Sequence, residues 1–361
     1  QIFFVIFFFS TLQAKNPDKF IQGNHISGYF SGILLLKDNQ YDKSYTYLKQ
    51  LDGLEEKHIN FSSRYLSTLI NSGRYREAFN YSKKLEKKNL GNFESDLVLG
   101  VYYLKNNKYD LANNYFLKLQ KRKSNFIINN FVSSSLFNWT SFKKMDLVTA
   151  QKKIDAINPR YKTLKSIQNV FLHCFYNSKK TEFYYERLTT DKKIDFSRYN
   201  YFYATYLTTI NKVEKATKIV NASIELYPRN ILLNQYKFDL EKNKYHTNFD
   251  CQNLSHVIAE IFYITANALS TQNIYDFSNF YLNLSKYLNK DFHSFDSLLA
   301  ENFYKKDNFK QAKKIYNKIG KRGQAYLWYS TKQNAKILIK EKKKEKALKI
   351  MASAFKNLSE K

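Results

Sequence analysis

Histidine, aspartate and cysteine, which are residue types that bind transition metals, occur together in one polar stretch of this chain. His246, Asp250, Cys251 and His256 supply four side chains that could act as ligands. The five-residue intervals from His246 to Cys251 and from Cys251 to His256 match none of the common zinc signatures. We therefore expect no metal here, and no motif indicates a bound cofactor.

Catalytic chemistry also lacks its usual sequence signatures. The chain contains no Gly-rich dinucleotide loop, P-loop, nucleophile elbow or HExxH pair. Glu55 and Glu56 are adjacent carboxylates, but successive residues of a helix do not face one substrate together. We expect a protein that is not an enzyme and that takes no small-molecule substrate.

An internal repeat indicates which secondary-structure elements would position any functional residue. Tyr41, Tyr75 and Tyr109 are 34 residues apart, and a small residue follows each of them three positions later. These small residues are Ser44, Ala78 and Ala112. The same interval returns near the other end of the chain, with Tyr275 and Ser278 followed by Phe309 and Ala312, and Ala347 follows 35 residues after Ala312.

A second set of size-restricted positions lies twelve residues before the small residues. Its members are Gly32, Leu66, Gly100, Ala204, Ala266, Ala300 and Ala335, of which only Leu66 is large. Small side chains at two such points let antiparallel helices approach closely where they cross. In the third unit, residues 97–103 and 109–119 carry apolar stripes on either side of a polar turn. The pattern predicts helix hairpins that cover their apolar faces by stacking on neighbours.

These units resemble tetratricopeptide repeats. The best copy runs over 195–229, where Ala204, Ala216, Ser223 and Pro228 match that family's small-residue sites and terminal proline. Seven units carry the pattern, and they begin near His25, Lys57, Gly91, Asp195, Ala259, Asp291 and Tyr326. The resemblance implies an all-α fold, an α-solenoid in which stacked hairpins form a right-handed superhelix. It is similar to secreted or periplasmic bacterial members of the family, of alphaproteobacterial type.

The register of the repeat divides the chain into five segments. A signal peptide is expected over 1–14, and regular hairpins follow over 15–123. Degenerate helical repeats are expected over 124–194, with helices at 131–139, 149–157, 164–176 and 181–188. A regular hairpin with an extra helix covers 195–244, and further hairpins with a capping helix cover 245–361.

The two cysteines of the chain, Cys174 and Cys251, fall in different parts of this array. A disulfide requires Cα atoms within about 7 Å of one another. Units so far apart in a solenoid rarely meet, so we expect these cysteines not to pair.

The concave wall of such a solenoid, lined by the first helix of each hairpin, is the usual binding surface. Tyr and Arg are frequent binding anchors. The predicted partner-binding residues are Arg198, Tyr201, Thr205, Tyr263, Asn267 and Tyr304. Some family members clamp the C-terminal carboxylate of a chaperone with a Lys and an Asn, but here Tyr263 stands where that Lys would precede Asn267. We therefore expect no chaperone-tail receptor.

The charge of the chain is strongly basic. Its net charge of +28 comes from 59 Lys and Arg against 31 Asp and Glu, yet only nine of the bases are Arg. A basic surface favours anionic partners, whereas Arg is the better phosphate reader and the lysine pairs are scattered along the chain. We expect a scaffold or adaptor of the cell envelope that binds an unidentified protein or peptide partner. The alternative is a basic scaffold for an anionic polymer, such as a polysaccharide, a lipid surface or, least favoured, nucleic acid.

The N-terminal residues indicate export. Residues 2–9 read IFFVIFFF, and a short run ending at Ala14 precedes the polar sequence. This is typical of the apolar region and cleavage site of a secretory signal peptide, and it is shorter than the ~20 residues of a membrane-spanning helix. We expect cleavage after Ala14 and a secreted or periplasmic location, with an uncleaved anchor or a buried element as alternatives.

The C-terminal residues predict a helix that closes the array. Ala347, Ile350, Met351, Ala354 and Leu358 form one apolar stripe, with lysines outside it. A terminal capping helix requires one apolar and one polar face. Binding to anionic lipid is the alternative role for this basic amphipathic helix.

Overall fold

The computed structural model describes residues 23–122, 126–190 and 194–359, and these ranges contain nineteen α-helices and no β-strand. The N-terminal hairpins are α1 (Gly23–Lys37) with α2 (Tyr41–Leu48), α3 (Phe61–Asn71) with α4 (Tyr75–Lys87), and α5 (Phe93–Lys105) with α6 (Tyr109–Lys121). The central elements are α7 (Ile127–Phe142) with α8 (Leu147–Asp155), α9 (Lys162–Phe175) with α10 (Thr181–Thr189), α11 (Ser197–Thr209) with α12 (Val213–Leu226), and the single helix α13 (Ile231–Glu241). The C-terminal hairpins are α14 (Leu254–Thr271) with α15 (Tyr275–Leu288), α16 (Ser294–Lys305) with α17 (Phe309–Gly320), and α18 (Gln324–Lys340) with α19 (Lys344–Ser359).

The predicted all-α fold of stacked helix hairpins is confirmed. The second helix of a hairpin begins at the repeated aromatic residue in α2, α4, α6, α15 and α17. The twelve-residue spacing marks a direct contact, because Ser44 Oγ donates a hydrogen bond to the backbone oxygen of Gly32 at 2.8 Å. Ser278 Oγ donates to the backbone oxygen of Ala266 at the same distance. Small residues thus mark the crossing points within hairpins, as the sequence predicts.

The turn inside seven of the described hairpins uses a left-handed residue that the repeat pattern did not reveal. It lies two positions before the second helix, and it is Asn39, Gly73, Asn107, Asn211, Asn273, Asp307 or Lys342. Gly and Asn adopt this conformation at the least cost. The Asn side chain also fastens the turn, since the Tyr41 hydroxyl donates to Asn39 Oδ1 at 2.7 Å.

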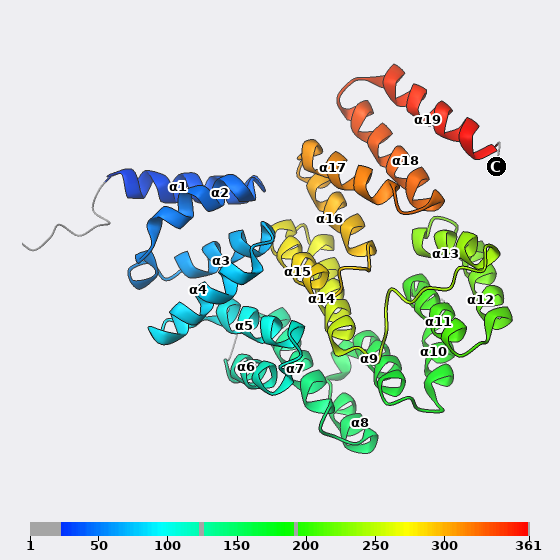
Figure 1. Ribbon diagram of the computed structural model, residues 1–361, viewed down its shortest axis with the longest axis horizontal. Helices are drawn as coiled ribbons and strands as arrows, with labels where there is room; N and C mark the ends of the chain where they lie inside the picture. The colour runs from blue at the N-terminus through cyan, green and yellow to red at the C-terminus, as the bar shows by residue number, and fades with distance from the viewer. Residues whose placement is uncertain (1–22, 123–125, 191–193, 360–361) are drawn as a thin grey trace, which may run out of the picture.

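The row of hairpins closes on itself. Helix α15 packs against α3 and α5, and α14 packs against α7, so the α14–α15 hairpin lies between the N-terminal hairpins and the central ones (Figure 1). Asn283 Nδ2 of α15 donates to Asn71 Oδ1 of α3 at 3.0 Å. The rings of Tyr75 and Tyr287 stack with centroids 4.2 Å apart.

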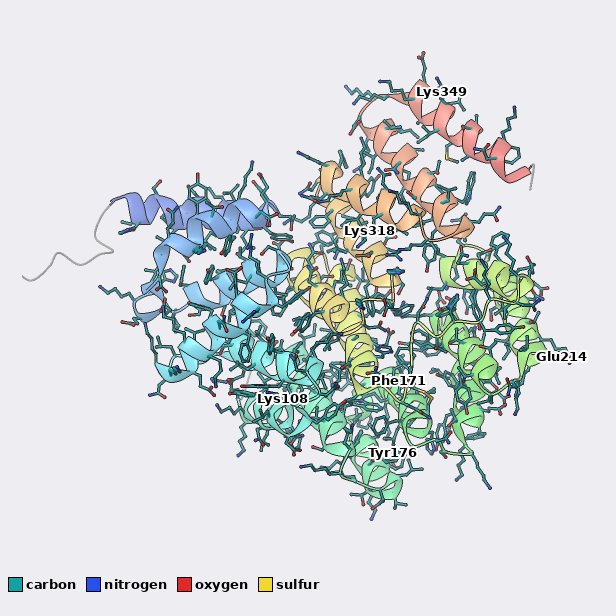
Figure 2. The ribbon with its side chains drawn as sticks, in the orientation of Figure 1. Lys108, Phe171, Tyr176, Glu214, Lys318 and Lys349 are labelled. Atoms are coloured by element: carbon teal, nitrogen blue, oxygen red, sulfur yellow. A yellow bond between two sulfur atoms is a disulfide. The ribbon has the colours of Figure 1, made fainter. Side chains whose placement is uncertain are left out.

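A segment without helix, residues 242–253, returns the chain from α13 to α14 through the middle of the molecule (Figure 1). The ring of Phe249 in this crossing segment stacks on Phe202 of α11, with centroids 4.2 Å apart. Phe171 of α9 lies against the same ring at 5.0 Å, within the aromatic packing of the core (Figure 2).

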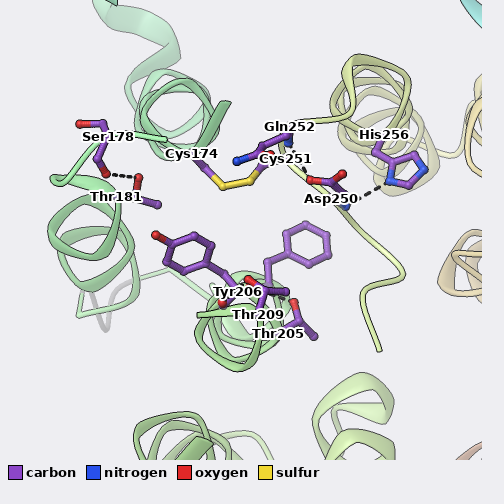
Figure 3. Close-up of a disulfide and its surroundings, with 11 residues drawn as sticks. Cys174, Ser178, Thr181, Thr205, Tyr206, Thr209, Asp250, Cys251, Gln252 and His256 are labelled. Carbon is purple, nitrogen blue, oxygen red and sulfur yellow. Dashed lines mark hydrogen bonds between the residues drawn. A yellow bond between two sulfur atoms is a disulfide. The ribbon is translucent and has the colours of Figure 1, made fainter. Parts of the chain in front are cut away.

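Cys251 of the crossing segment forms a disulfide with Cys174 of α9, and their Cα atoms are 5.8 Å apart (Figure 3). The expectation that these cysteines do not pair is therefore wrong. It assumed an open row of hairpins, whereas the closed array brings the crossing segment back to a helix 77 residues earlier.

Neighbouring hairpins are joined by ion pairs between residues about one repeat apart. Lys118 Nζ lies 2.8 Å from Glu86 Oε1, and Lys306 Nζ lies 2.7 Å from Asp276 Oδ1. Lys215 and Lys340 make comparable pairs with Glu182 and Asp307. Each exposed pair contributes little to the free energy of unfolding. Together, these pairs show that some of the excess lysines bind carboxylates of neighbouring hairpins.

The last helix, α19, packs against α18. Ala347 of its predicted apolar stripe is buried, and Ile350, Met351 and Ala354 are half-buried. Within the described ranges, no helix is both long and apolar enough to span a membrane. The predicted signal peptide, residues 1–14, lies outside these ranges.

Candidate functional site

The inner wall of the first hairpins is already occupied by the chain itself. Helices α3 and α5, which would line a concave groove, contact α15 instead. Ile70 of α3 is buried, and its neighbour Asn71 bonds to Asn283 of α15. An open surface for a partner must therefore lie further along the array.

Such a surface is a cavity of about 450 Å³ between the central and C-terminal hairpins. Helices α9, α11, α13, α14, α16 and α18 all contribute to its wall. Its polar side chains include Tyr263, Asn267, Ser297 and Glu301, and its apolar ones include Leu164 and Tyr326. We call this space the inner cavity. Among the described residues, no lysine lines it.

A buried ion pair forms one side of the inner cavity. The guanidinium of Arg198 donates from Nε to Glu260 Oε1 and from Nη2 to Glu260 Oε2, both at 2.6 Å. Its Nη1 donates to Ser294 Oγ at 2.9 Å. The Glu260 side chain is fully buried, and that of Arg198 is 13% exposed. Arg198 is therefore engaged within the fold, rather than held out for a partner.

Aromatic rings enclose the same guanidinium. Its central carbon lies 3.7 Å from the centroid of the Tyr263 ring and 4.6 Å from that of Phe292. Burial alone would lower the pKa of Arg198, but the charge and hydrogen bonds of Glu260, together with the nearby Tyr263 and Tyr199, outweigh burial and keep that pKa above its usual range. Burial raises the pKa of the Tyr263 phenol, and the carboxylates of Glu260 and Glu301 act in the same direction against the charge of Arg198. The Tyr263 side chain therefore carries a neutral hydroxyl.

The structure brings together three of the six predicted partner-binding residues. Arg198, Tyr263 and Asn267 line the inner cavity, and of these three only Asn267 is exposed. Tyr304 is half-buried beside Phe309 and does not line this cavity.

Tyr201 and Thr205 do not face an open wall, so their predicted placement there is wrong. Both are almost completely buried. The ring of Tyr201 packs against Tyr236 of α13 and Phe292, with centroids 5.4 and 6.1 Å away. Helix α11 is covered on several sides because the array closes, and a repeat register does not show this.

A second cavity, of about 540 Å³, adjoins the inner cavity. Thr163, Ile194 and Phe196 line both spaces. Lys162, Lys165 and Arg187 contribute the charges of this second cavity. We call it the basic cavity. The repeat register did not single out its residues, because α9 and α10 lie in the degenerate stretch.

The metal-ligand residue types of the crossing segment have other roles. In the described parts of the chain, no three His, Cys, Asp or Glu side chains are grouped to hold a metal ion. His246 Nε2 lies 2.8 Å from Asp239 Oδ2, and His256 Nδ1 accepts a hydrogen bond from the backbone nitrogen of Asp250 at 3.1 Å (Figure 3). Together with the disulfide at Cys251, these contacts fasten the crossing segment.

No protein-family model and no curated protein matches this chain. Among solved structures, the chain is similar to yeast Tom70, with a TM-score of 0.29 and 15% identity over 91% of both chains. It is also similar to the structure of Naa15/Naa10 bound to HypK-THB, with a TM-score of 0.24 and 13% identity over 91% of this chain and 63% of that one. Likenesses at this level carry no argument about function. The stacked helix hairpins are consistent with a tetratricopeptide-repeat protein.

Proposed function

We propose that this protein is a non-enzymatic scaffold of the cell envelope that holds a peptide or protein segment in the inner cavity. The observation that carries the proposal is the cavity itself, whose volume of about 450 Å³ falls within the range of ligand pockets. It combines an apolar wall with a few polar side chains, which is the composition of a binding site.

The polar groups of the inner cavity suit the recognition of a peptide. The amide of Asn267 and the hydroxyls of Tyr263 and Ser297 can exchange hydrogen bonds with backbone N–H and C=O groups. The Arg198–Glu260 pair fixes the Tyr263 ring from beneath, so this surface is rigid before a partner binds. A preformed surface lowers the entropic cost of binding.

The disulfide supports the envelope location. Disulfides persist mainly in oxidising compartments, such as the bacterial periplasm. The Cys174–Cys251 bond agrees with the export expected from the apolar residues 2–9. Alkylation of intact cells with a mass-adding maleimide should leave the native protein unlabelled until it is reduced. Immediate labelling of both cysteines in unreduced samples would contradict the location.

Selection of binding peptides tests the cavity. We expect wild-type protein to enrich a set of phage-displayed heptapeptides, and the Asn267→Trp variant to lose them because the indole fills the cavity mouth. Asn114→Trp, at an exposed position of α6 outside the described cavities, is the matched control and should retain binding. Equal binding by wild type and Asn267→Trp would exclude the inner cavity as the site.

A further inference from the structure

We infer that the bound segment carries an acidic side chain, which Lys162, Lys165 and Arg187 hold in the basic cavity. The inference rests on the proposed function, because the basic cavity adjoins the inner cavity. Thr163, Ile194 and Phe196 form the shared wall. A segment in the inner cavity can therefore continue over these three residues into the basic cavity.

Among the described residues, two of the three positive charges in the basic cavity, those of Lys162 and Arg187, have no compensating carboxylate. Lys162 and Lys165 lie in the first turns of α9, and Arg187 lies in α10. Among the described residues, no Asp or Glu lines this space. Ser166 and Asn169 add neutral hydrogen-bonding groups to the same wall.

Two of these cations have no acidic partner in the part of the chain that the structure describes. Lys165 Nζ donates to the backbone oxygen of Asp155 at 2.8 Å and lies 3.5 Å from its carboxylate, which holds that lysine in place. Within the described ranges, neither Lys162 nor Arg187 forms an ion pair, unlike the lysines that join neighbouring hairpins. An Arg guanidinium binds a carboxylate through two parallel hydrogen bonds, so Arg187 suits an acidic side chain.

The two cavities differ in charge, which gives the bound segment a direction. In the inner cavity, Glu260 neutralises the charge of Arg198. The other charged residues of its wall are Arg229, which is exposed, and the two acids Asp195 and Glu301. The described residues that line the basic cavity carry positive charge only. The acidic residue is therefore placed at the α9–α10 end, with apolar neighbours over Ile194 and Phe196 and the remainder of the segment toward Glu301. Like charges disfavour the reverse orientation.

The peptides selected on the wild-type protein test this inference directly. We expect them to be enriched in Asp or Glu, and a labelled copy of the strongest one to lose at least about tenfold in affinity when its acid is changed to the amide. The Lys162→Ala/Arg187→Ala variant should lose a similar factor for the acidic peptide and little for the amide version. Fluorescence anisotropy at 150 mM salt, about physiological ionic strength, measures the dissociation constant of each peptide for each variant.

A matched control separates local recognition from general attraction to a basic protein. Lys310→Ala/Lys314→Ala removes the same charge from exposed positions of α17 that line none of the described cavities, and it should change affinity less than about twofold. Equal losses of affinity in the two double variants would overturn the inference, because they would show that the acidic peptide is attracted by the overall positive charge of the protein.

The outcomes also distinguish this inference from the proposed function. Binding that is abolished by Asn267→Trp but unaffected by Lys162→Ala/Arg187→Ala would overturn the acidic-segment inference and leave the scaffold proposal standing. Selected peptides that show no enrichment of Asp or Glu would also overturn the acidic-segment inference and leave the scaffold proposal standing. A selection that enriches no peptide, or binding that resists both variants, would overturn both.

Discussion

Asn279 of α15 donates a hydrogen bond from Nδ2 to the hydroxyl oxygen of Tyr41 at 3.0 Å, although 238 residues separate them in the chain. Asn302 Nδ2 donates to Asn279 Oδ1 at 2.9 Å, which extends the contact to α16. All three side chains are buried. A buried polar network of this kind helps to specify one arrangement of packed helices. It fixes the position at which the array closes.

Asn302→Ala should be strongly destabilising. The Asn302 amide also accepts from Ser270 Oγ at 2.6 Å and donates to Ser278 Oγ at 2.8 Å, so its loss leaves several buried polar groups without partners. We expect a loss of about 3 kcal/mol in the free energy of unfolding, measured with urea. Asn267→Ala, at an exposed position, is the control and should cost less than about 0.5 kcal/mol. Similar midpoints for the two variants would contradict a role for the network.

The hairpins could be predicted from sequence because their determinants are local. A small residue such as Ser44 and its partner Gly32 meet within one hairpin, so their spacing appears directly in the chain. The closure could not be predicted, because it depends on small rotations accumulated over many hairpins. Tyr41 and Asn279 carry no pattern that relates them, and neither do Cys174 and Cys251.

The candidate site was predictable only in part. Tyr263 and Asn267 line the inner cavity as the register of the first helices indicates. Arg198 lines it too, but the register could not show that Glu260 would engage its guanidinium. Tyr201 has a suitable position in the repeat and is nevertheless buried by Tyr236 of α13, whose return across α11 has no counterpart in the repeat.

Gly100→Ala tests the close approach of helices within a hairpin. A Cβ at Gly100 would lie 2.3 Å from a ring carbon of Phe116, and the ring is fully buried. Overpacking of this kind costs about 1–3 kcal/mol. In contrast, Gly28→Ala would place its Cβ 3.9 Å from Leu51, an ordinary contact, and should be neutral or stabilising by up to about 1 kcal/mol. Thermal unfolding of both variants would check the contrast, and equal effects would argue against crossing points set by small residues.

The Arg198–Glu260 pair should show strong coupling. Arg198→Met leaves the Glu260 carboxylate buried without a countercharge, and breaking a buried pair in this way costs about 3–5 kcal/mol. The double variant Arg198→Met/Glu260→Leu removes both charges and should recover most of that loss. A double-mutant cycle in urea measures the coupling. Additive losses from the two single changes would mean that the pair does not act as a unit.

Glu86 should make stability depend on acid pH. Burial would raise its pKa, but hydrogen bonds from Lys118, Lys83 and Tyr115 lower it to about 2 from the usual 4.5. The native state therefore favours the carboxylate, so the contribution is complete above about pH 4.5 and is lost as the pH falls toward 2.

Urea midpoints of wild type and Glu86→Gln at pH 6, 4 and 3 should therefore converge as the pH decreases. Glu214→Gln, at an exposed position of α12, serves as the matched control and should remain close to wild type throughout. A gap between wild type and Glu86→Gln that widens toward pH 3 would contradict the assignment.

The long-range contact of Tyr41 with Asn279 affects how the protein unfolds. An open row of repeats unfolds from its ends, because each repeat contacts only its neighbours. Here the first hairpin is bonded to α15 in the C-terminal half, so removal of the first hairpin exposes a packed surface in the opposite half of the chain. The polypeptide should accordingly melt in a single cooperative step. It should also refold slowly, because partners more than 200 residues apart must find one another.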